Sequence, residues 1–235
     1  MSFNPNEFDR SYAPAGYTET IGQYTAKTFL WMVLGLMITF GVAVASWMSG
    51  VFYLALQFHW VILIATLVMS ITMSVRIERM STFTAKAIFV AFSALFGLTM
   101  SIYLVIFQLT SVILVFLLTA VYFAVLAAYG HFTRRDLSNL RPILFGGLIF
   151  LVVFAILSLF IPALSAMDRI VCLVGIAVFL GYTAYDTQKI KAYYHYYAGF
   201  PDMLEKASIF SALQLYLDFL NLFIYLLRYL GVRRD

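Results

Sequence analysis

The chain has 235 residues, of which 63% are hydrophobic and only 11% are charged, and its mean hydropathy is +0.94. This composition excludes an ordinary soluble domain and indicates a membrane protein. The net charge of +4 does not indicate nucleic acid as a partner, because the basic residues are scattered among the connecting segments. The single cysteine, Cys172, excludes a disulfide within the chain and a cysteine-based metal motif.

Seven segments are long and apolar enough to cross a lipid bilayer as helices, which takes roughly 20 residues each. They are residues 27–48, 51–75, 86–107, 109–130, 142–162, 168–188 and 207–230. The segments are apolar all round and do not alternate, so the pattern predicts an all-α bundle of seven transmembrane helices and argues against a β-barrel. Residues 189–206 are expected to form the connection before the last helix.

Two units are expected along the chain. Residues 1–26 are polar and lack the apolar core of a signal peptide, so they predict an N-terminal arm. Residues 27–235 form the predicted transmembrane domain, which leaves no room for a separate soluble domain.

The distribution of basic residues predicts the orientation in the membrane, since Lys and Arg favour cytoplasmic connections. One side of the predicted bundle carries Arg10, Lys27, Arg76, Arg79, Lys86, Arg134, Arg135, Arg141, Lys189, Lys191 and Lys206. The loops on the other side carry only Arg169. We therefore expect a multi-pass membrane protein with a cytoplasmic N-terminus. The tail contradicts a seventh crossing, because it adds Arg228, Arg233 and Arg234 to the outer side.

Asp218 interrupts the last apolar segment, where an ionised carboxylate in hydrocarbon is costly and rarely kept without a partner or a task. The polar residues that share its helical face are Ser211, Gln214, Asn221 and Tyr225. A polar stripe along a membrane helix needs partners from other helices or from water. The last helix is therefore expected to lie against or inside the bundle.

A second acid, Asp186, closes the preceding apolar segment and shares a face with Tyr182 and Thr183. The two helices run antiparallel, so the two acids are expected to approach within hydrogen-bond or one-water distance. Asp218 lies about 16 Å in from residue 207 at 1.5 Å per residue, so this pairing requires the last helix to be displaced inward. Two carboxylates in a low dielectric cannot both ionise cheaply and would share a proton. Such a pair could also bind Ca²⁺.

Two alternatives compete with a functional pair. The acids could be hydrogen-bonded groups that only tie two helices together, just as Ser93, Gly97 and Ser101 are expected only to let helices pack closely. The acids could also be the catalytic pair of an intramembrane aspartyl protease, whose first signature resembles Tyr185-Asp186. The Gly-x-Gly-Asp signature of those enzymes is absent around Asp218, which argues against a protease and for a protein that is not an enzyme.

Four stretches resemble signatures of the Bax inhibitor-1 (transmembrane Bax-inhibitor-motif) family, and the similarity runs over nearly the whole chain. They are GYTAYDTQKIK at 181–191, LQLYLDFLNLF at 213–223, SALFGLTMS at 93–101 and YGHFTRRDLS at 129–138. The resemblance implies a seven-helix bundle whose last helix is surrounded by the other six. The polar arm is similar to that of bacterial members, which implies the bacterial cytoplasmic (inner) membrane. It also implies a pH-sensitive Ca²⁺ leak gated by Asp186 and Asp218, with Ca²⁺ as the transported ion and no other cofactor.

The same resemblance implies a basic partner for the acid pair at the end of the second helix, where Arg76 is the best match and Arg79 lies close by. One departure concerns the second helix itself. Members with a leak carry a glutamate there, whereas residues 65–70 are uncharged in this chain. Attraction of cations is therefore expected to be weaker. Other bacterial members are similar to non-conducting regulators that bind membrane quality-control proteases, which makes such a protease the alternative partner beside the lipid bilayer, Ca²⁺ and protons.

Overall fold

The computed structural model describes residues 19–234, so most of the expected N-terminal arm lies outside the described residues. The described chain is helical and contains no β-strand, only an isolated bridge between Phe107 and Arg233. Seven helices are long and apolar enough to span a membrane, as the sequence predicts. In chain order the helices are α1 Ile21–Ser49, α2 Phe52–Gln57, α3 His59–Arg76, α4 Thr82–Ile106, α5 Leu109–Phe132, α6 Arg141–Phe160, α7 Asp168–Tyr196 and α8 Pro201–Leu230, with 3-10 turns at Ser138–Leu140 and Pro162–Met167.

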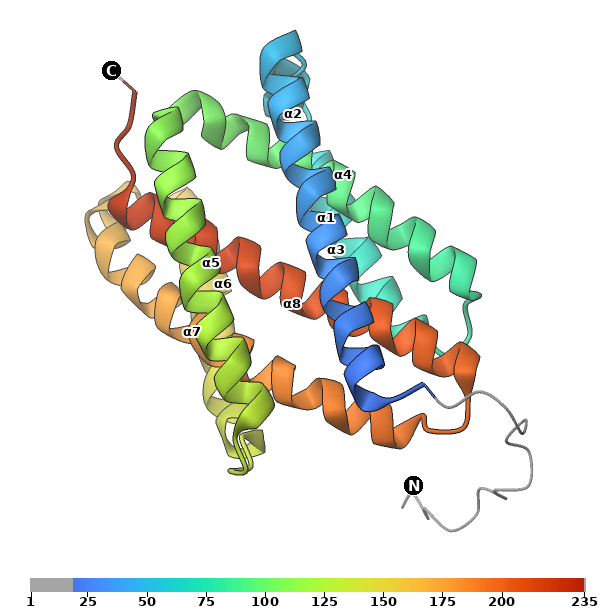
Figure 1. Ribbon diagram of the computed structural model, residues 1–235. Helices are drawn as coiled ribbons and strands as arrows, with labels where there is room; N and C mark the ends of the chain where they lie inside the picture. Colours follow the sequence, from blue (N-terminus) through green and yellow to red (C-terminus); the bar gives the residue numbers. More distant parts are fainter. Residues whose placement is uncertain (1–18, 235) are drawn as a thin grey trace.

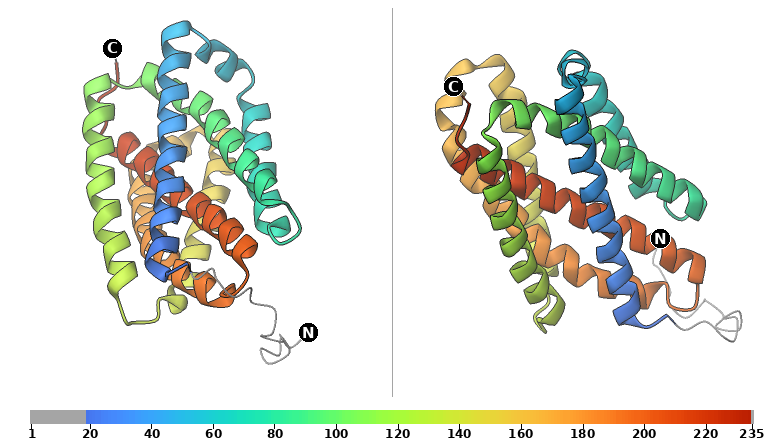
Figure 2. Two further views of the ribbon diagram at one scale, coloured as in Figure 1. Left: turned by 45° about the vertical axis from the view of Figure 1, so that its right-hand side comes forward. Right: turned by 45° about the horizontal axis from the view of Figure 1, so that its top comes forward.

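The last helix, α8, forms the centre of the bundle (Figures 1 and 2). In its most apolar stretch, 67% of the residues are buried inside the protein, against 39% or less in every other spanning helix. It packs against α1, α4, α5 and α7. A helix enclosed in this way can carry polar side chains that lipid would not tolerate. The central place expected for the last helix is therefore confirmed, although it packs closely against four of the other spanning helices and not against all six.

Helix boundaries follow local capping chemistry. Thr20 and Gln23 form a capping box that starts α1, and the Ser81 hydroxyl accepts a hydrogen bond from the Thr84 amide at the start of α4. Gly50 ends α1 with φ of 80°, in the left-handed region that glycine adopts without strain. The second predicted helix is broken at Phe58 into α2 and α3, which the sequence analysis did not anticipate.

The connection predicted at residues 189–206 is mostly helical, so that prediction is wrong. α7 continues to Tyr196, and α8 already begins at Pro201, with Gly199 at φ of 94° in the tight turn between them. Hydropathy detects the part of a helix that lies in hydrocarbon, whereas these ends are held by contacts within the protein. The hydroxyl of Tyr194, for example, donates a hydrogen bond of 2.6 Å to the Glu19 carbonyl.

Small residues allow close helix contacts where the pattern predicted them. A Cβ placed on Gly97 of α4 would lie 2.7 Å from the carbonyl oxygen of Thr39 in α1. Beside it, the Thr39 hydroxyl donates a hydrogen bond of 2.9 Å to the Ser93 carbonyl, and Ser46 contacts Ser101 at 3.4 Å. Packing between α1 and α4 therefore accounts for this row of small residues.

The C-terminal tail lies at the end of the bundle opposite to the start of α1 (Figure 1). Arg228 forms an ion pair with Asp168, and the guanidinium of Arg234 lies 5.2 Å from the ring centre of Trp47. The Val232 carbonyl also accepts a hydrogen bond of 2.9 Å from Gln108. These contacts hold basic residues at the end where the distribution of charges disfavours them, so the tail charges do not conflict with a complete seventh helix.

Candidate functional site

Asp218 lies near the middle of α8, seventeen residues after Pro201 or about 25 Å at 1.5 Å per residue. Its side chain is only 5% exposed. Among residues 19–234, no hydrogen-bond donor reaches its Oδ2 atom. A buried carboxylate oxygen without a partner is costly, which is the expected property of a site that binds a proton, water or an ion.

Asp186 lies on the neighbouring helix α7 and is 7% exposed. α7 and α8 pack along most of their lengths, and the charge of Asp186 acts on Asp218. No direct hydrogen bond joins the two carboxyl groups among the hydrogen bonds of the described chain. Asp186 also lies ten residues before the end of α7, not near its end as the predicted boundary suggested. The two acids thus form an electrostatic pair deep inside the bundle.

Lys189 is the basic residue that the structure brings to this pair. Its Nζ atom lies 3.9 Å from Oδ1 of Asp186, one helical turn away. The same ammonium group lies 5.7 Å and 5.3 Å from the ring centres of Tyr185 and Tyr193. Sequence reasoning missed this role because it assigned Lys189 to a loop. The signal was the spacing of three residues from Asp186, which places both side chains on one face only if the helix continues.

Arg76 and Arg79 are not brought to the pair. Both side chains are exposed at the end of α3, and neither forms an ion pair within residues 19–234. The charged groups that act on Asp218 are Asp186 and Lys189. The cationic partner observed beside the acids therefore comes from α7 and not from the second membrane segment.

The remaining polar residues of the predicted site have different surroundings. Tyr182 lies on α7 within reach of the charges of both acids. Asn221 donates a hydrogen bond of 2.8 Å to the Leu217 carbonyl within α8, and Gln214 is half-buried one turn before Asp218. Of these three residues, only Tyr182 therefore lies close to both acids.

A row of buried hydroxyl groups extends from Asp218 toward the start of α8. Ser211 lies two helical turns before Asp218 on the same face, and its hydroxyl adjoins that of Tyr24 in α1. Neither hydroxyl has a hydrogen-bond partner of good geometry in the described chain. Sequence reasoning identified Ser211 on the polar face but missed Tyr24, which sits at the start of a different helix.

The loop at the end of α3 is held to α8 at the same end of the bundle. The Nζ atom of buried Lys206 donates hydrogen bonds of 3.2 Å and 3.3 Å to the carbonyls of Glu78 and Met80. The Tyr197 hydroxyl donates a hydrogen bond of 3.0 Å to the Glu78 carboxylate. Burial and this carboxylate raise the pKa of Tyr197, so the phenol stays protonated and remains a donor at neutral pH.

Metal binding by the pair would use few protein ligands. Within the described chain, no group of three or more His, Cys, Asp or Glu side chains is placed to hold a metal ion. Asp186 and Asp218 supply carboxylate oxygens, which suit Ca²⁺, while neighbouring carbonyls and water would have to complete its usual six to eight ligands.

Comparison with known proteins gives the family. A family model described as "Inhibitor of apoptosis-promoting Bax1" matches residues 21–235. The uncharacterized protein RP147 of Rickettsia prowazekii is 36% identical over 223 residues, covering 93% of each chain. The inner membrane protein YbhL of Escherichia coli K12 is 37% identical over 219 residues, covering 90% of this chain and 92% of YbhL. The match extends through all seven spanning helices, and the chain therefore belongs to the Bax inhibitor-1 family of membrane proteins.

Proposed function

We propose that the protein is a proton-modulated cation leak, with Ca²⁺ as the ion, in the inner membrane, where the similar protein YbhL is named as residing. The observation that carries the proposal is the pair of buried carboxylates on α7 and α8, one of which has an unpartnered oxygen in the middle of the central helix. Structural ion pairs usually satisfy their oxygens, whereas a transport site keeps one available.

Protonation supplies the gate in this proposal. While Asp186 and Asp218 share a proton, they attract each other and the path is closed on their side of the bundle. When both ionise, like charges in a low-dielectric interior repel by on the order of a few kcal/mol, which is enough to shift a two-state equilibrium substantially. Raising the pH therefore favours the open state. At low pH, full protonation removes the carboxylate groups that Ca²⁺ requires.

Lys189 takes the basic role in this mechanism. Its ammonium group lies on the Asp186 side of the pair, so it favours ionisation of Asp186 first. Asp218 then carries the proton that is lost last. The second membrane segment, which is uncharged at residues 65–70, adds no acidic vestibule for cations. A slow leak fits this arrangement better than a fast channel does.

The decisive experiment is Ca²⁺ flux into liposomes that contain the purified protein, measured from pH 5 to 8. Asp186→Asn and Asp218→Asn should each abolish the pH dependence, because an amide does not titrate. Asp202→Asn is the matched control, since Asp202 lies on the same helix α8 but at its exposed end. The control should keep the pH response.

A different result would favour the rival function. If both Asn variants conduct with a normal pH response, the acid pair is not the gate. If the native protein conducts no cation, a non-conducting regulator that binds a membrane quality-control protease is the better assignment. In either case we propose an N-terminus on the cytoplasmic side, as the distribution of Lys and Arg indicates.

A further inference from the structure

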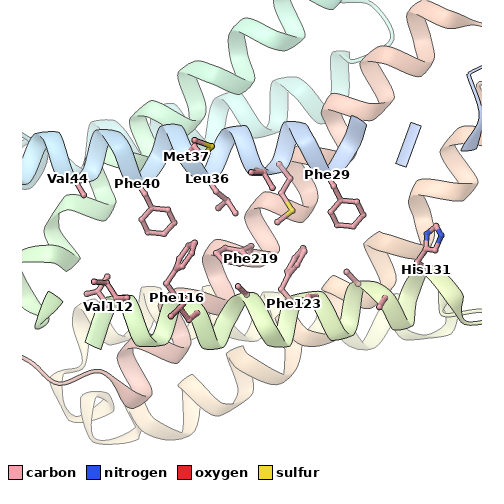
Figure 3. A pocket seen from close by; sticks show the side chains of 18 of the residues that line it. Phe29, Leu36, Met37, Phe40, Val44, Val112, Phe116, Phe123, His131 and Phe219 are labelled. Atoms are coloured by element: carbon pink, nitrogen blue, oxygen red, sulfur yellow. The ribbon is translucent and has the colours of Figure 1, made fainter. Parts of the chain in front are cut away.

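A long apolar groove separates α1 from α5 on the lipid-facing side of the bundle, with a volume of about 880 Å³. Figure 3 shows Phe29, Leu36 and Phe40 of α1 on one wall and Val112, Phe116 and Phe123 of α5 on the other. Phe219 of α8 lies between the walls and forms the floor. The groove therefore reaches the central helix at the residue next to Asp218.

This depth distinguishes the groove from an ordinary lipid-facing surface. α1 packs tightly on α4 but not on α5, and an aromatic pair joins α1 to α5 across the groove. The rings of Phe40 and Phe116 meet edge to face at 4.7 Å, and the rings of Phe116 and Phe219 lie 5.4 Å apart. The groove is thus closed on its inner side by rings and open on its outer side, which is the shape that a single chain can enter lengthwise.

The length of the groove matches the membrane. Its wall on α1 runs from Thr25 to Val44, which is about 28 Å at 1.5 Å per residue. A hydrocarbon core is roughly 30 Å thick, of which one extended acyl chain covers about half. One chain, or two chains end to end from opposite leaflets, would cover the lining. Almost all of that lining is apolar.

The two ends of the groove differ in polarity. Val44 and Leu109 line one end, whereas Thr25 and His131 line the other. Three and four residues after His131, the side chains of Arg134 and Arg135 are exposed, and neither forms an ion pair within residues 19–234. This end therefore offers the imidazole of His131 and positive charge to a negatively charged head group.

We infer that the groove is a binding site for one phospholipid with a net negative head group. One acyl chain lies along Phe116 and Phe219, and the phosphate lies near His131 and the two arginines. In this position the acyl chain packs against Phe219, the residue that follows Asp218 in α8. Binding of this lipid does not depend on ion conduction, so the inference stands apart from the proposed function.

The test is native mass spectrometry of the delipidated full chain, titrated separately with phosphatidylglycerol, phosphatidylcholine and palmitate. We expect one phosphatidylglycerol per protein, bound more tightly than the other two. Ala124→Trp places a bulky ring in the groove and should reduce that binding by about tenfold or more. Ala155→Trp is the matched control, because Ala155 is an exposed alanine on the lipid-facing helix α6 outside the groove.

Two further variants distinguish the loss of the binding site from a folding defect. Ala128→Trp fills the polar half of the groove and should act like Ala124→Trp, with an unchanged midpoint of thermal unfolding for both. Replacing Arg134 and Arg135 together by alanine should lower the preference for phosphatidylglycerol over phosphatidylcholine by roughly 10- to 30-fold. Binding of the acyl chain in the groove should persist in that variant.

Three outcomes would overturn the inference. Equal binding by Ala124→Trp and Ala155→Trp would show that the groove is not the site. Equal affinity for palmitate and phosphatidylglycerol would identify a free fatty acid as the ligand. The third outcome is a groove that takes up no lipid in bilayer nanodiscs and whose residues cross-link to a helix of another membrane protein. That result would identify a protein as the ligand in place of a lipid.

Discussion

At the scale of single residues, the environment of Asp218 is the feature on which the proposed function depends. A carboxylate that has an unpartnered oxygen and feels the charges of Asp186 and Lys189 is sensitive to any change in its neighbours. The sequence alone was enough to find both acids, because charged residues are rare in its apolar segments. It did not identify Lys189, since the partner of an acid depends on where the helix ends.

Lys189→Met should move the pH response of the leak to higher pH. Removing the cation withdraws the charge that favours ionised Asp186, so a higher pH is needed to reach the doubly charged, open state. Lys189→Arg keeps the charge and should restore a nearly normal profile. The measurement is the pH of half-maximal Ca²⁺ flux in liposomes. An unchanged pH of half-maximal flux in Lys189→Met would show that Lys189 does not influence the titration of the acid pair.

At the scale of helices, close approach depends on a few glycines. A Cβ on Gly130 of α5 would lie 2.2 Å from the carbonyl oxygen of Ala184 in α7, two residues before Asp186. Both atoms belong to rigid helix backbones, so neither can rotate away. Gly130 therefore sets the spacing between α5 and the helix that carries one of the two acids.

Gly130→Ala should destabilise the protein by roughly 1–3 kcal/mol, the usual cost of overpacking a filled interface. Gly146→Ala is the control, because no atom of the described chain outside the local helix backbone lies within 4 Å of a Cβ built there. That variant should be neutral or stabilising by up to about 1 kcal/mol, as expected for glycine replaced by alanine in a helix. Unfolding midpoints in detergent would measure both. Similar values for the two variants would contradict the close contact.

Lys206→Met should loosen the loop that joins α3 to α4. The substitution keeps the length of the side chain but removes the donor to the carbonyls of Glu78 and Met80, at a cost of about 1–3 kcal/mol if those groups stay buried. Faster amide hydrogen exchange at residues 77–81, with unchanged exchange in α5, would be the expected result. Uniform protection in both segments would show that the ammonium group does not hold the loop.

The helices show why some of the fold could be predicted and some could not. The seven membrane segments follow from burial of apolar residues in lipid, which hydropathy measures directly. The added helical turns before Tyr196 and after Pro201 depend on contacts such as Tyr194 with Glu19, which join residues far apart in the chain. The placement of Tyr24 beside Ser211 depends on the same kind of long-range packing.

At the scale of the whole molecule, seven helices are long and apolar enough to cross a membrane, and seven crossings would place the start of α1 and the end of α8 on opposite sides. The tail contacts of Arg228 and Arg234 remove the objection raised by its positive charges. The turn between α5 and α6 and the turn between α6 and α7 must then face opposite compartments.

Cysteine labelling in intact cells should confirm this arrangement. In a Cys172→Ser background, Asn139→Cys should react only with a reagent that enters the cytoplasm, and Ser165→Cys should react with an impermeant reagent from outside. Both positions are exposed, whereas native Cys172 is buried and should not react. Labelling of both new cysteines from the same side would exclude seven crossings.

The central position of α8 also has a consequence for biosynthesis. The ribosome delivers this helix last, so α1 to α7 enter the membrane before the element around which they pack exists. Until then, the polar partners on the surrounding helices face each other or lipid. The bundle can therefore complete its packing only after α8, with Asp218 at its middle, has been inserted. Because α1 and α5 are not packed directly on each other, the side between them is where α8 would meet the least resistance.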